Sequence, residues 1–254
     1  MADELELPPG FSRNLPTIQN AIAIFDEWGS ALPIPGTPAG GTPLFSADLD
    51  RRPSFVRNVF GALDQFDILE LGSYEGGHSY QLEKLLGAKS VTSIEANAES
   101  FIKSLIIKEV LQLKGRFLHG DFIKYLETAP RRYDLIFACG VLYHMTDPLH
   151  LLNLISRQTD RTFVWTHYVS VQEAGRWADS FDVERYGFNC RYYRYIYDPN
   201  THSRAHSGTE TYCCQLLKDD ILGALKSYGF TKIRMIADHP QETGGSHVSI
   251  VAYR

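Results

Sequence analysis

The residues of this chain that could do chemistry gather at the ends of short apolar runs. The first run leads into ELGSYEGGH, residues 70–78, a glycine-rich turn that precedes a helical segment. Such a turn lets a ligand approach the backbone and places it at the N-terminus of a helix. Gly72 and Gly77 fit the first and third glycines of the dinucleotide fingerprint GxGxxG, but Tyr74 stands at the second. Because a pyrophosphate needs close backbone approach at that position, the turn alone is a weak signal.

Acidic residues or glycine also end the next three apolar runs. Glu95 ends the second run, Asp121 the third, and Cys139-Gly140 the fourth. A carboxylate at position 95 can accept hydrogen bonds from both hydroxyls of a ribose, and one at position 121 from an exocyclic amine. Taken singly, each acid is typical of a helix N-cap. Successive run ends that all carry glycine or acid together favour a cofactor site.

These residues must be positioned by an alternation of strands and helices. The apolar runs that predict strands are residues 67–71, 91–96, 116–119, 133–140 and 161–167. Between them, residues 98–113 carry an apolar stripe at helical spacing, and Asp147-Pro148 is typical of a helix start. Short strands that alternate with helices predict a parallel sheet, which binds ligands at the carboxyl ends of its strands.

The two ends of the chain differ from this pattern. Eight of the 12 prolines lie in the first 53 residues. We expect an amphipathic helix over residues 17–28 and an irregular arm over residues 29–53, because proline and glycine oppose helices and strand ladders. Residues 1–54 are therefore set apart from a domain over residues 55–254. Near the C-terminus, a helix over 218–228 precedes two strands, 231–237 and 247–253, whose glycine-containing loop suits an antiparallel hairpin.

A family resemblance is carried by the segments ILELGSYEGGH, SIEAN, HGDF and YDLIFACGVLYHMTDPLHLL. They resemble motifs I to IV of class I S-adenosylmethionine-dependent methyltransferases over residues 55–170, and the C-terminal hairpin matches as well. The resemblance implies a Rossmann-like α/β fold, with a seven-stranded sheet of order 3-2-1-4-5-7-6 in which strand 7 is antiparallel. The likeness is greatest to bacterial methyltransferases with an LELG…EGGH motif. A weaker one, around GVLYH, is to the tRNA wobble-uridine carboxymethyltransferase.

The resemblance also implies which residues hold the cofactor, S-adenosylmethionine. The implied set is Glu70, Gly72, Ser73, Gly76, His78, Glu95, Ala96, Asp121, Phe122, Cys139 and Gly140. Within it, the first loop surrounds the methionine part, Glu95 holds the ribose, Asp121 and Phe122 hold the adenine, and Cys139-Gly140 forms the floor beneath the sulfonium. His78 is interpreted as a residue that orients the loop or contacts the cofactor. The acidic loop suits a cationic sulfonium and disfavours NAD, although the family often has glycine in place of Tyr74.

Residues for the acceptor side are expected after the fourth and fifth strands. Tyr143-His144 follows the fourth strand and His167 ends the fifth, so all three should face the same crevice. Methyl transfer is an in-line displacement, and a hydroxyl acceptor must also lose a proton, which a histidine could accept near neutral pH. The alternative is that His144 only hydrogen-bonds backbone and shapes the pocket.

Residues 181–212 form a segment rich in tyrosine and arginine after the fifth strand. They hold six of the 14 tyrosines, together with four arginines. Stacking and forked hydrogen bonds suit a planar, anionic or glycan acceptor, so we expect a cap that binds the acceptor, with Arg191 and Tyr193 in contact with it. The alternatives are a lid packed on its own aromatics and the surface of a homodimer.

Composition excludes several other classes of protein. The 254 residues carry 25 Lys and Arg against 30 Asp and Glu, a formal net charge of −5, which disfavours a nucleic-acid partner. The four cysteines lack CxxC spacing and no His and Asp cluster has ligand spacing, so we expect no metal site. The first residues contain no apolar signal sequence and no run approaches a membrane span, so a cytoplasmic location is expected.

The sequence thus favours an enzyme that transfers a methyl group from S-adenosylmethionine to a small-molecule acceptor, with oxygen slightly favoured over nitrogen. One alternative is a tRNA-modifying (carboxy)methyltransferase, which the negative net charge disfavours. The other is a non-enzymatic module that binds the cofactor. Salt-dependent retention of tRNA would favour the first alternative, and cofactor binding without turnover would favour the second.

Overall fold

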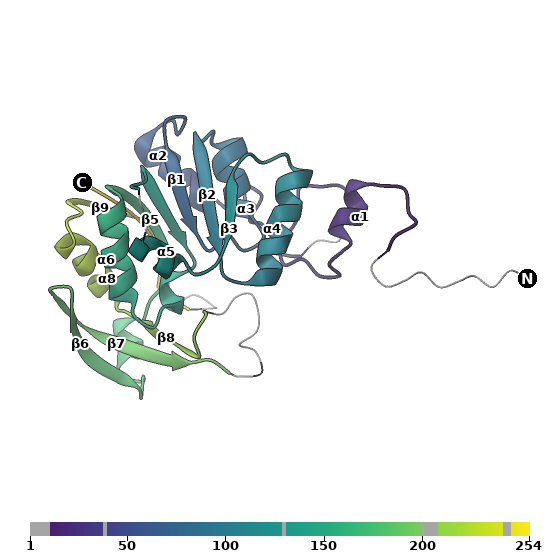
Figure 1. Cartoon of the computed structure of the whole chain (residues 1–254). Helices are drawn as coiled ribbons and strands as arrows, with labels where there is room; N and C mark the ends of the chain where they lie inside the picture. The colour runs from purple at the N-terminus through teal and green to yellow at the C-terminus, as the bar shows by residue number, and fades with distance from the viewer. Residues whose placement is uncertain (1–10, 38–39, 129–130, 199, 201–207, 241–244) are drawn as a thin grey trace, which may run out of the picture.

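The main body of the protein is a seven-stranded sheet between two layers of helices (Figure 1). The structure is a computed structural model, and it describes all residues except 1–10, 38–39, 129–130, 199, 201–207 and 241–244. The strands are β1 (Asp67–Leu71), β2 (Ser90–Glu95), β3 (Arg116–His119), β4 (Leu135–Cys139), β5 (Arg161–His167), β9 (Lys232–His239) and β10 (His247–Tyr253). They lie in the order β3-β2-β1-β4-β5-β10-β9. Counted along the chain, this confirms the predicted order 3-2-1-4-5-7-6. The last strand, β10, is antiparallel to both neighbours, as predicted.

The central strands form because each is a short apolar run that the sheet buries on both faces. Every residue of β4 is buried, and so is every residue of β1 after Asp67. Parallel pairing sets Leu71 of β1 beside Ile94 of β2 and Ala138 of β4. The strands therefore end at one common edge of the sheet, which is where the predicted site residues follow. All the predicted strands are present, with small shifts at their ends.

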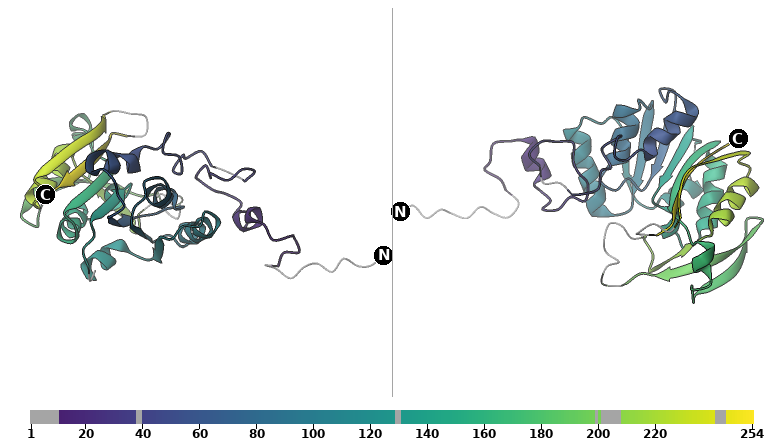
Figure 2. Two further views of the ribbon diagram at one scale, coloured as in Figure 1. Left: turned by 90° about the horizontal axis from the view of Figure 1, so that it is seen from above. Right: turned by 180° about the vertical axis from the view of Figure 1, so that it is seen from behind.

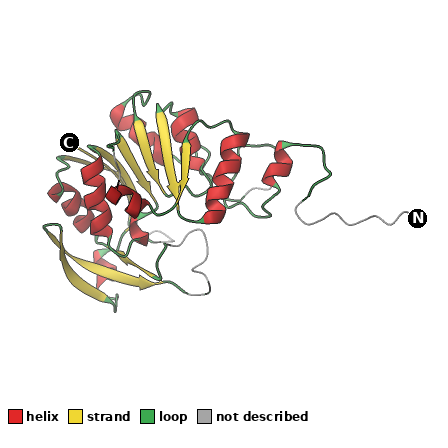
Figure 3. Cartoon of the chain, viewed as in Figure 1, coloured by secondary structure: helices red, strands yellow, loops and turns green. Residues whose placement is uncertain are grey.

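The helices cover both faces of the sheet (Figure 3). They are α2 (Arg52–Phe60), α3 (Gly77–Tyr80), the π-helical turn η1 (Gln81–Leu85), α4 (Ala98–Val110), α5 (Phe122–Thr128), the 3-10 turn η2 (Leu142–His144), α6 (Pro148–Gln158), α7 (Val171–Ala174) and α8 (Lys218–Ser227). Residues of α5, α6 and α8 share one core with the sheet, whereas α2 and η1 pack on the opposite face. As predicted, α6 begins after the N-cap Asp147, which accepts a hydrogen bond from His150 N at 3.0 Å. Within the described ranges, no helix has the length and apolar character that a membrane crossing requires.

The N-terminal helix is shorter than the sequence predicts. It spans only Ile18–Ile22 (α1), with Thr17 as its N-cap, rather than residues 17–28. The indole Nε1 of Trp28 donates a hydrogen bond to the carbonyl of Ile22 at 3.1 Å, so the chain folds back on the last turn instead of continuing it. The Trp28 ring is thereby buried in a cluster that includes Ile107 of α4. Tertiary packing, rather than the apolar stripe, sets the end of this helix.

The arm over residues 29–53 is irregular, as predicted, but it packs closely on the main domain. Figure 2 shows it running along the side of the domain between α1 and α2. The carboxylate of Glu75 accepts hydrogen bonds from the backbone amides of Gly29, at 3.0 Å, and Ser30, at 2.8 Å. The side-chain amide of Gln81 donates to the carbonyl of Leu44 at 2.8 Å. The division of the chain at residue 54 stays a prediction, and α2 begins two residues before it.

The segment predicted to be a cap is a second, antiparallel sheet. This small sheet consists of β6 (Ser180–Arg185), β7 (Phe188–Ile196) and β8 (Tyr212–Gln215), in that spatial order. Tyr186 and Gly187, which both have positive φ, form the two-residue turn between β6 and β7. Tyr192 is buried and belongs to the same core as α6 and α8. Aromatic side chains thus attach the small sheet to the main domain.

Candidate active site

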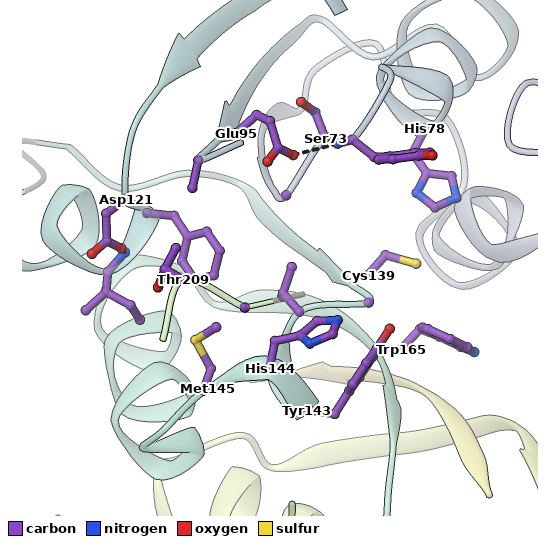
Figure 4. Close-up of a pocket in the computed structure, with 18 of the residues that line it drawn as sticks. Ser73, His78, Glu95, Asp121, Cys139, Tyr143, His144, Met145, Trp165 and Thr209 are labelled. Atoms are coloured by element: carbon purple, nitrogen blue, oxygen red, sulfur yellow. Dashed lines mark hydrogen bonds between the residues drawn. The ribbon is translucent and has the colours of Figure 1, made fainter. Parts of the chain in front are cut away.

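A cavity of about 400 Å³, the first pocket, lies at the carboxyl ends of β1 to β4 (Figure 4). The predicted cofactor residues that line it are Gly72, Ser73, His78, Glu95, Ala96, Asp121, Phe122, Cys139 and Gly140. Two other members of the predicted set, Glu70 and Gly76, do not line it. The sheet therefore brings the ends of four strands to one cavity, as the sequence indicated.

Glu70 and Gly76 support the glycine-rich turn but do not line the first pocket. Glu70 is 1% exposed and accepts hydrogen bonds from the hydroxyls of Ser79 and Ser93. Burial raises the pKa of this carboxyl, and its Oε1 has no hydrogen-bond partner among the described residues. Gly76, with φ of 84°, is the N-cap of α3. Both residues thus support the turn without forming the wall of the pocket.

Gly72 allows the turn to pass close to the end of β4. It has a φ of 72°, and a Cβ at this position would lie 2.7 Å from Cγ1 of Val141. Glycine is therefore required here both by conformation and by space. The next side chain, the hydroxyl of Ser73, is buried at the pocket wall with no hydrogen-bond partner among the described residues. A polar ligand in the pocket would satisfy this hydroxyl.

The ring of Tyr74 points from the glycine-rich turn toward the arm. Tyr74 has a φ of 51°, and its hydroxyl would lie 1.9 Å from a Cβ placed on Gly29, so the ring extends to the arm. Burial raises the pKa of Tyr74 to about 12. Tyr74 is still among the residues that line the first pocket, so the steric argument against a pyrophosphate, like the exclusion of NAD, stays a prediction.

Backbone amides hold Glu95 and Asp121 in place at the ends of β2 and β3. The two oxygens of Glu95 accept hydrogen bonds from Tyr74 N, at 2.7 Å, and Asn97 N, at 2.8 Å. Asp121 Oδ1 accepts one from Ile123 N at 2.7 Å. Burial raises the pKa of Glu95, although these amides favour its ionised form. Each carboxylate oxygen keeps capacity for a further donor, as the binding of ribose hydroxyls or an exocyclic amine requires.

His78 connects the start of α3 to the arm. Its Nε2 lies 2.8 Å from Oδ2 of Asp50, and both residues are buried. Burial by itself lowers the pKa of His78, but Cys139 and Asp50 more than reverse this effect and raise it to about 10. The same Asp50 carboxylate accepts hydrogen bonds from Nε and Nη2 of Arg52, at 2.8 and 2.7 Å. The contact between His78 and the arm is of the orienting kind that the sequence suggested.

A second cavity of about 340 Å³, the second pocket, lies between the end of β5 and the small sheet. Tyr143 and His144 line both pockets and so form the boundary between them. The other residues that line the second pocket are His167, Tyr168, Val169, Glu173, Trp177, Tyr195, Tyr197, Cys213, Gln215, Gly245 and Ser246. The three residues predicted for the acceptor side therefore meet where the two pockets adjoin.

At this boundary the pKa of a histidine is lowered and the pKa of a tyrosine is raised. His144 Nδ1 lies 2.7 Å from the hydroxyl of Tyr197, and the rings of Tyr143 and His167 are 4.7 Å apart, edge to face. Burial lowers the pKa of His167, and His247 lowers it further. Burial raises the pKa of Tyr143. At neutral pH a neutral His167 can therefore accept a proton, whereas Tyr143 keeps its own.

The two cap residues predicted to contact an acceptor line neither of the two pockets, and their contact with an acceptor stays a prediction. The guanidinium of Arg191 forms an exposed ion pair with Asp182, at 2.7 and 2.9 Å. Tyr193 is buried against the ring of Trp177 and does not line either pocket. Tyr195 and Tyr197, further along the same segment, line the second pocket instead. Arg191, Tyr193 and Tyr195 share one face of β7, so position along the strand, and not strand alternation, separates the residues that line the pocket from those that do not.

The arm also contributes to the first pocket, which its sequence pattern did not indicate. Thr42, Leu44 and Arg52 all line the first pocket. The guanidinium carbon of Arg52 lies 4.8 Å from the centroid of the Trp165 ring, and Trp165 lines the same pocket. Proline and glycine made the arm resemble a simple connection. A sequence feature that could have indicated this role is the grouping of the charged residues of the arm at one end, at positions 48–52.

Solved structures share this architecture. The N-terminal domain of EvdMO1, determined in the presence of S-adenosylhomocysteine (SAH) and D-fucose, superposes with a TM-score of 0.71 at 20% identity over 93% of this chain and 95% of that one. Whole EvdMO1 matches with a TM-score of 0.63 over 46% of its length. An S-adenosylmethionine-dependent methyltransferase from Clostridium acetobutylicum ATCC 824 has a TM-score of 0.53 at 13% identity, covering 82% and 93% of the two chains. No protein-family model and no curated protein sequence matches the chain.

The strand order, the antiparallel last strand and these structural neighbours define the chain as having the class I S-adenosylmethionine-dependent methyltransferase fold. In the parts of the chain that the structure describes, no three His, Cys, Asp or Glu side chains are grouped so as to hold a metal ion. That the protein needs no metal stays a prediction.

Proposed function

We propose that this protein transfers a methyl group from S-adenosylmethionine to a hydroxyl group of a small molecule. The observation that carries the proposal is the junction of the two pockets at Tyr143 and His144. One pocket contains acids at the strand ends, and the other contains aromatic rings and histidines. An in-line displacement requires a donor and an acceptor held on either side of a shared opening.

The residues of the first pocket fit S-adenosylmethionine. Glu95 would hold the ribose hydroxyls and Asp121 the exocyclic amine of adenine, and the unsatisfied hydroxyl of Ser73 would meet a polar group of the methionine part. When bound, the cofactor supplies an electrophilic methyl group on a positively charged sulfur. The main observation in favour of this fit is a buried hydroxyl that lacks a partner in a pocket lined by carboxylates.

His167 is the base in this proposal. Its lowered pKa keeps it neutral near pH 7, so it can take the proton that an acceptor hydroxyl loses. Tyr143 retains its proton and can donate a hydrogen bond to the acceptor oxygen. His144 is tied to Tyr197 at 2.7 Å, so it positions the boundary between the pockets. Deprotonation and alignment are thus assigned to different side chains.

A sugar is the proposed acceptor class. The aromatic residues Trp177, Tyr195 and Tyr197 line the second pocket, and the polar residues Glu173 and Gln215 line it as well. Flat apolar surfaces beside hydrogen-bonding groups suit a ring that carries hydroxyls. The neighbouring EvdMO1 domain, whose structure was determined with SAH and D-fucose present, supports this choice.

Methyl transfer from labelled S-adenosylmethionine tests the proposal. The purified protein would be incubated with D-fucose and other 6-deoxyhexosides, with simple phenols, with primary amines, and then with fractionated cell extract. We expect label in the sugar set or in a carbohydrate-containing fraction. Label confined to amines or to tRNA would contradict the proposal, and SAH binding without turnover on any fraction would favour a non-enzymatic module.

A further inference from the structure

The arm delivers an arginine into the first pocket. Arg52 stands at the start of α2 and lines the cavity, although it precedes every segment that carries the sequence motifs. Its side chain is 24% exposed, and its guanidinium lies over the ring of Trp165 at 4.8 Å. Asp50, only 4% exposed in its side chain, binds it from one side. The cation is therefore held at the wall of the pocket and not free in solvent.

One edge of this guanidinium is left for a ligand. Asp50 occupies the side edge, formed by Nε and Nη2, with distances of 2.8 and 2.7 Å. The end edge, formed by Nη1 and the second hydrogen of Nη2, has no acceptor among the described residues. A guanidinium edge presents two parallel N–H donors that match a carboxylate. Because Asp50 and Trp165 fix the plane of the group, this edge is oriented before a ligand arrives.

His78, the other cation at this end of the pocket, has less to offer. Its Nε2 is bound to Asp50 at 2.8 Å, and its side chain is only 8% exposed. The imidazolium is therefore engaged within the protein. Arg52 is thus the cation here whose donors remain available to a bound anion.

The charged residues that line the first pocket are arranged by sign along its length. Asp121 and His78 lie toward opposite ends of the row of labelled residues, with Glu95 and Ser73 between them (Figure 4). Among the residues that line the pocket, Glu95 and Asp121 lie at the end formed by β2 and β3, whereas His78 and Arg52, which share the buried carboxylate of Asp50, lie at the end nearest the arm. S-adenosylmethionine has the matching order: a nucleoside with hydroxyl and amine donors at one end, and an amino acid with an anionic carboxylate at the other.

We propose that Arg52 binds the α-carboxylate of the methionine part of the cofactor, through its end edge. The inference rests on the proposed function, since it takes the nucleoside end of the same ligand to lie at Glu95 and Asp121. It assigns to the arm a direct role in cofactor recognition, in addition to its packing on the glycine-rich turn. Selection of the amino-acid end would then come from outside the segments that resemble the family motifs.

Calorimetry with two ligands tests the assignment without the need for an acceptor. SAH carries the carboxylate, whereas its decarboxylated form, S-adenosyl-3-thiopropylamine, keeps the nucleoside and the amine. We expect the wild-type protein to bind SAH at least about tenfold more tightly, since a charge-assisted carboxylate contact is lost in the second ligand. Arg52→Gln should weaken SAH binding about tenfold or more and change the Kd of the decarboxylated ligand less than about threefold.

Two further variants serve as controls for the Arg52→Gln measurement. Arg51→Gln removes a neighbouring exposed arginine that does not line the pocket, and should leave both Kd values unchanged. Arg52→Lys keeps the charge without the fork and should fall between wild type and Arg52→Gln. Melting temperatures would identify a variant that binds neither ligand because it is unfolded, and Arg52→Lys would then carry the test.

The outcomes separate this inference from the proposed function. If Arg52→Gln retains the wild-type preference for SAH, or loses both ligands equally while folded, the assignment of the carboxylate to Arg52 is overturned. If the folded wild-type protein binds neither ligand, the proposed function itself fails. A preference that disappears in Arg52→Gln alone supports the assignment.

Discussion

His78 and Asp50 form a buried contact between the main domain and the arm, with Nε2 and Oδ2 2.8 Å apart. The pKa of Asp50 lies well below its usual value, because hydrogen bonds from His78 and Arg52 outweigh the opposing effect of burial. The pKa of His78 is raised to about 10. Both groups are therefore ionised at neutral pH, and the start of α3 is tied to the arm by opposite charges.

The first prediction is a loss of stability at alkaline pH. An unfolded histidine has a pKa near 6.5, so the stabilisation that His78 gains from its proton is complete below about pH 6.5. It disappears as the pH rises through about 10. We expect the free energy of unfolding, measured with denaturant, to decrease between about pH 7 and pH 10.

Asp50→Asn provides the comparison for this prediction. Removing one partner of a buried ion pair should lower the stability at pH 7 by roughly 3–5 kcal/mol and flatten the alkaline decrease. Asp48→Asn, which changes an exposed acid of the same arm, should keep the wild-type profile. An Asp50→Asn profile with the wild-type slope would show that another group titrates in this range.

The parts of the site that the sequence predicts are those determined by local pattern. Glu95 and Asp121 follow short apolar runs, and the burial of those runs on both faces of a parallel sheet leaves few places for the residues that end them. The positions of Tyr143 and His144 follow from the same rule. Such residues are found because the sheet edge is a consequence of hydrophobic periodicity and chain order.

The parts that the sequence does not predict depend on contacts between distant segments. The ring of Tyr74 turns toward Gly29 because the arm packs there, and the arm packs there because Glu75 binds its backbone amides. Backbone amides are the same for every residue type except proline, so no local sequence pattern indicates this contact. The direction of Arg191 is likewise decided by its pairing with Asp182 across two strands.

The second prediction concerns Glu95→Ala. The loss of hydrogen bonds to a charged group should weaken SAH binding by roughly 1.5–3 kcal/mol, as measured by calorimetry. We also expect the free energy of unfolding of Glu95→Ala to be lower than that of the wild type, because the backbone amides of Tyr74 and Asn97 lose their acceptor. Glu109→Ala, at an exposed position of α4, serves as the control and should change neither quantity. Unchanged SAH affinity in Glu95→Ala would mean that the ribose does not lie at the end of β2.

The third prediction assigns the base. His167→Asn should lower kcat by a factor of roughly 10²–10⁴ while the Kd for SAH stays within about threefold. The wild-type kcat should rise with pH through a pKa below the ordinary value for histidine, because burial and His247 both disfavour the charged form of His167. His247→Asn removes one of these influences and should move the acid limb to higher pH. Were His144→Asn alone to abolish turnover, the base would be His144.

The last prediction uses two residues on one face of β7 to separate the second pocket from the part of the small sheet that lies beyond it. Tyr195 lines the second pocket, whereas Arg191, four residues earlier on the same face of β7, pairs with Asp182 and does not line it. Loss of an aromatic face from an acceptor site should raise the KM for the acceptor, so we expect Tyr195→Ala to raise it about tenfold, or ~1.4 kcal/mol. Arg191→Ala should leave KM, kcat and the Kd for SAH unchanged. Acceptor kinetics and SAH titrations on both variants test this prediction. An effect of Arg191→Ala on KM equal to that of Tyr195→Ala would show that the acceptor site extends along the small sheet beyond the second pocket. Weakened SAH binding in Tyr195→Ala would show that the two pockets are not separate sites.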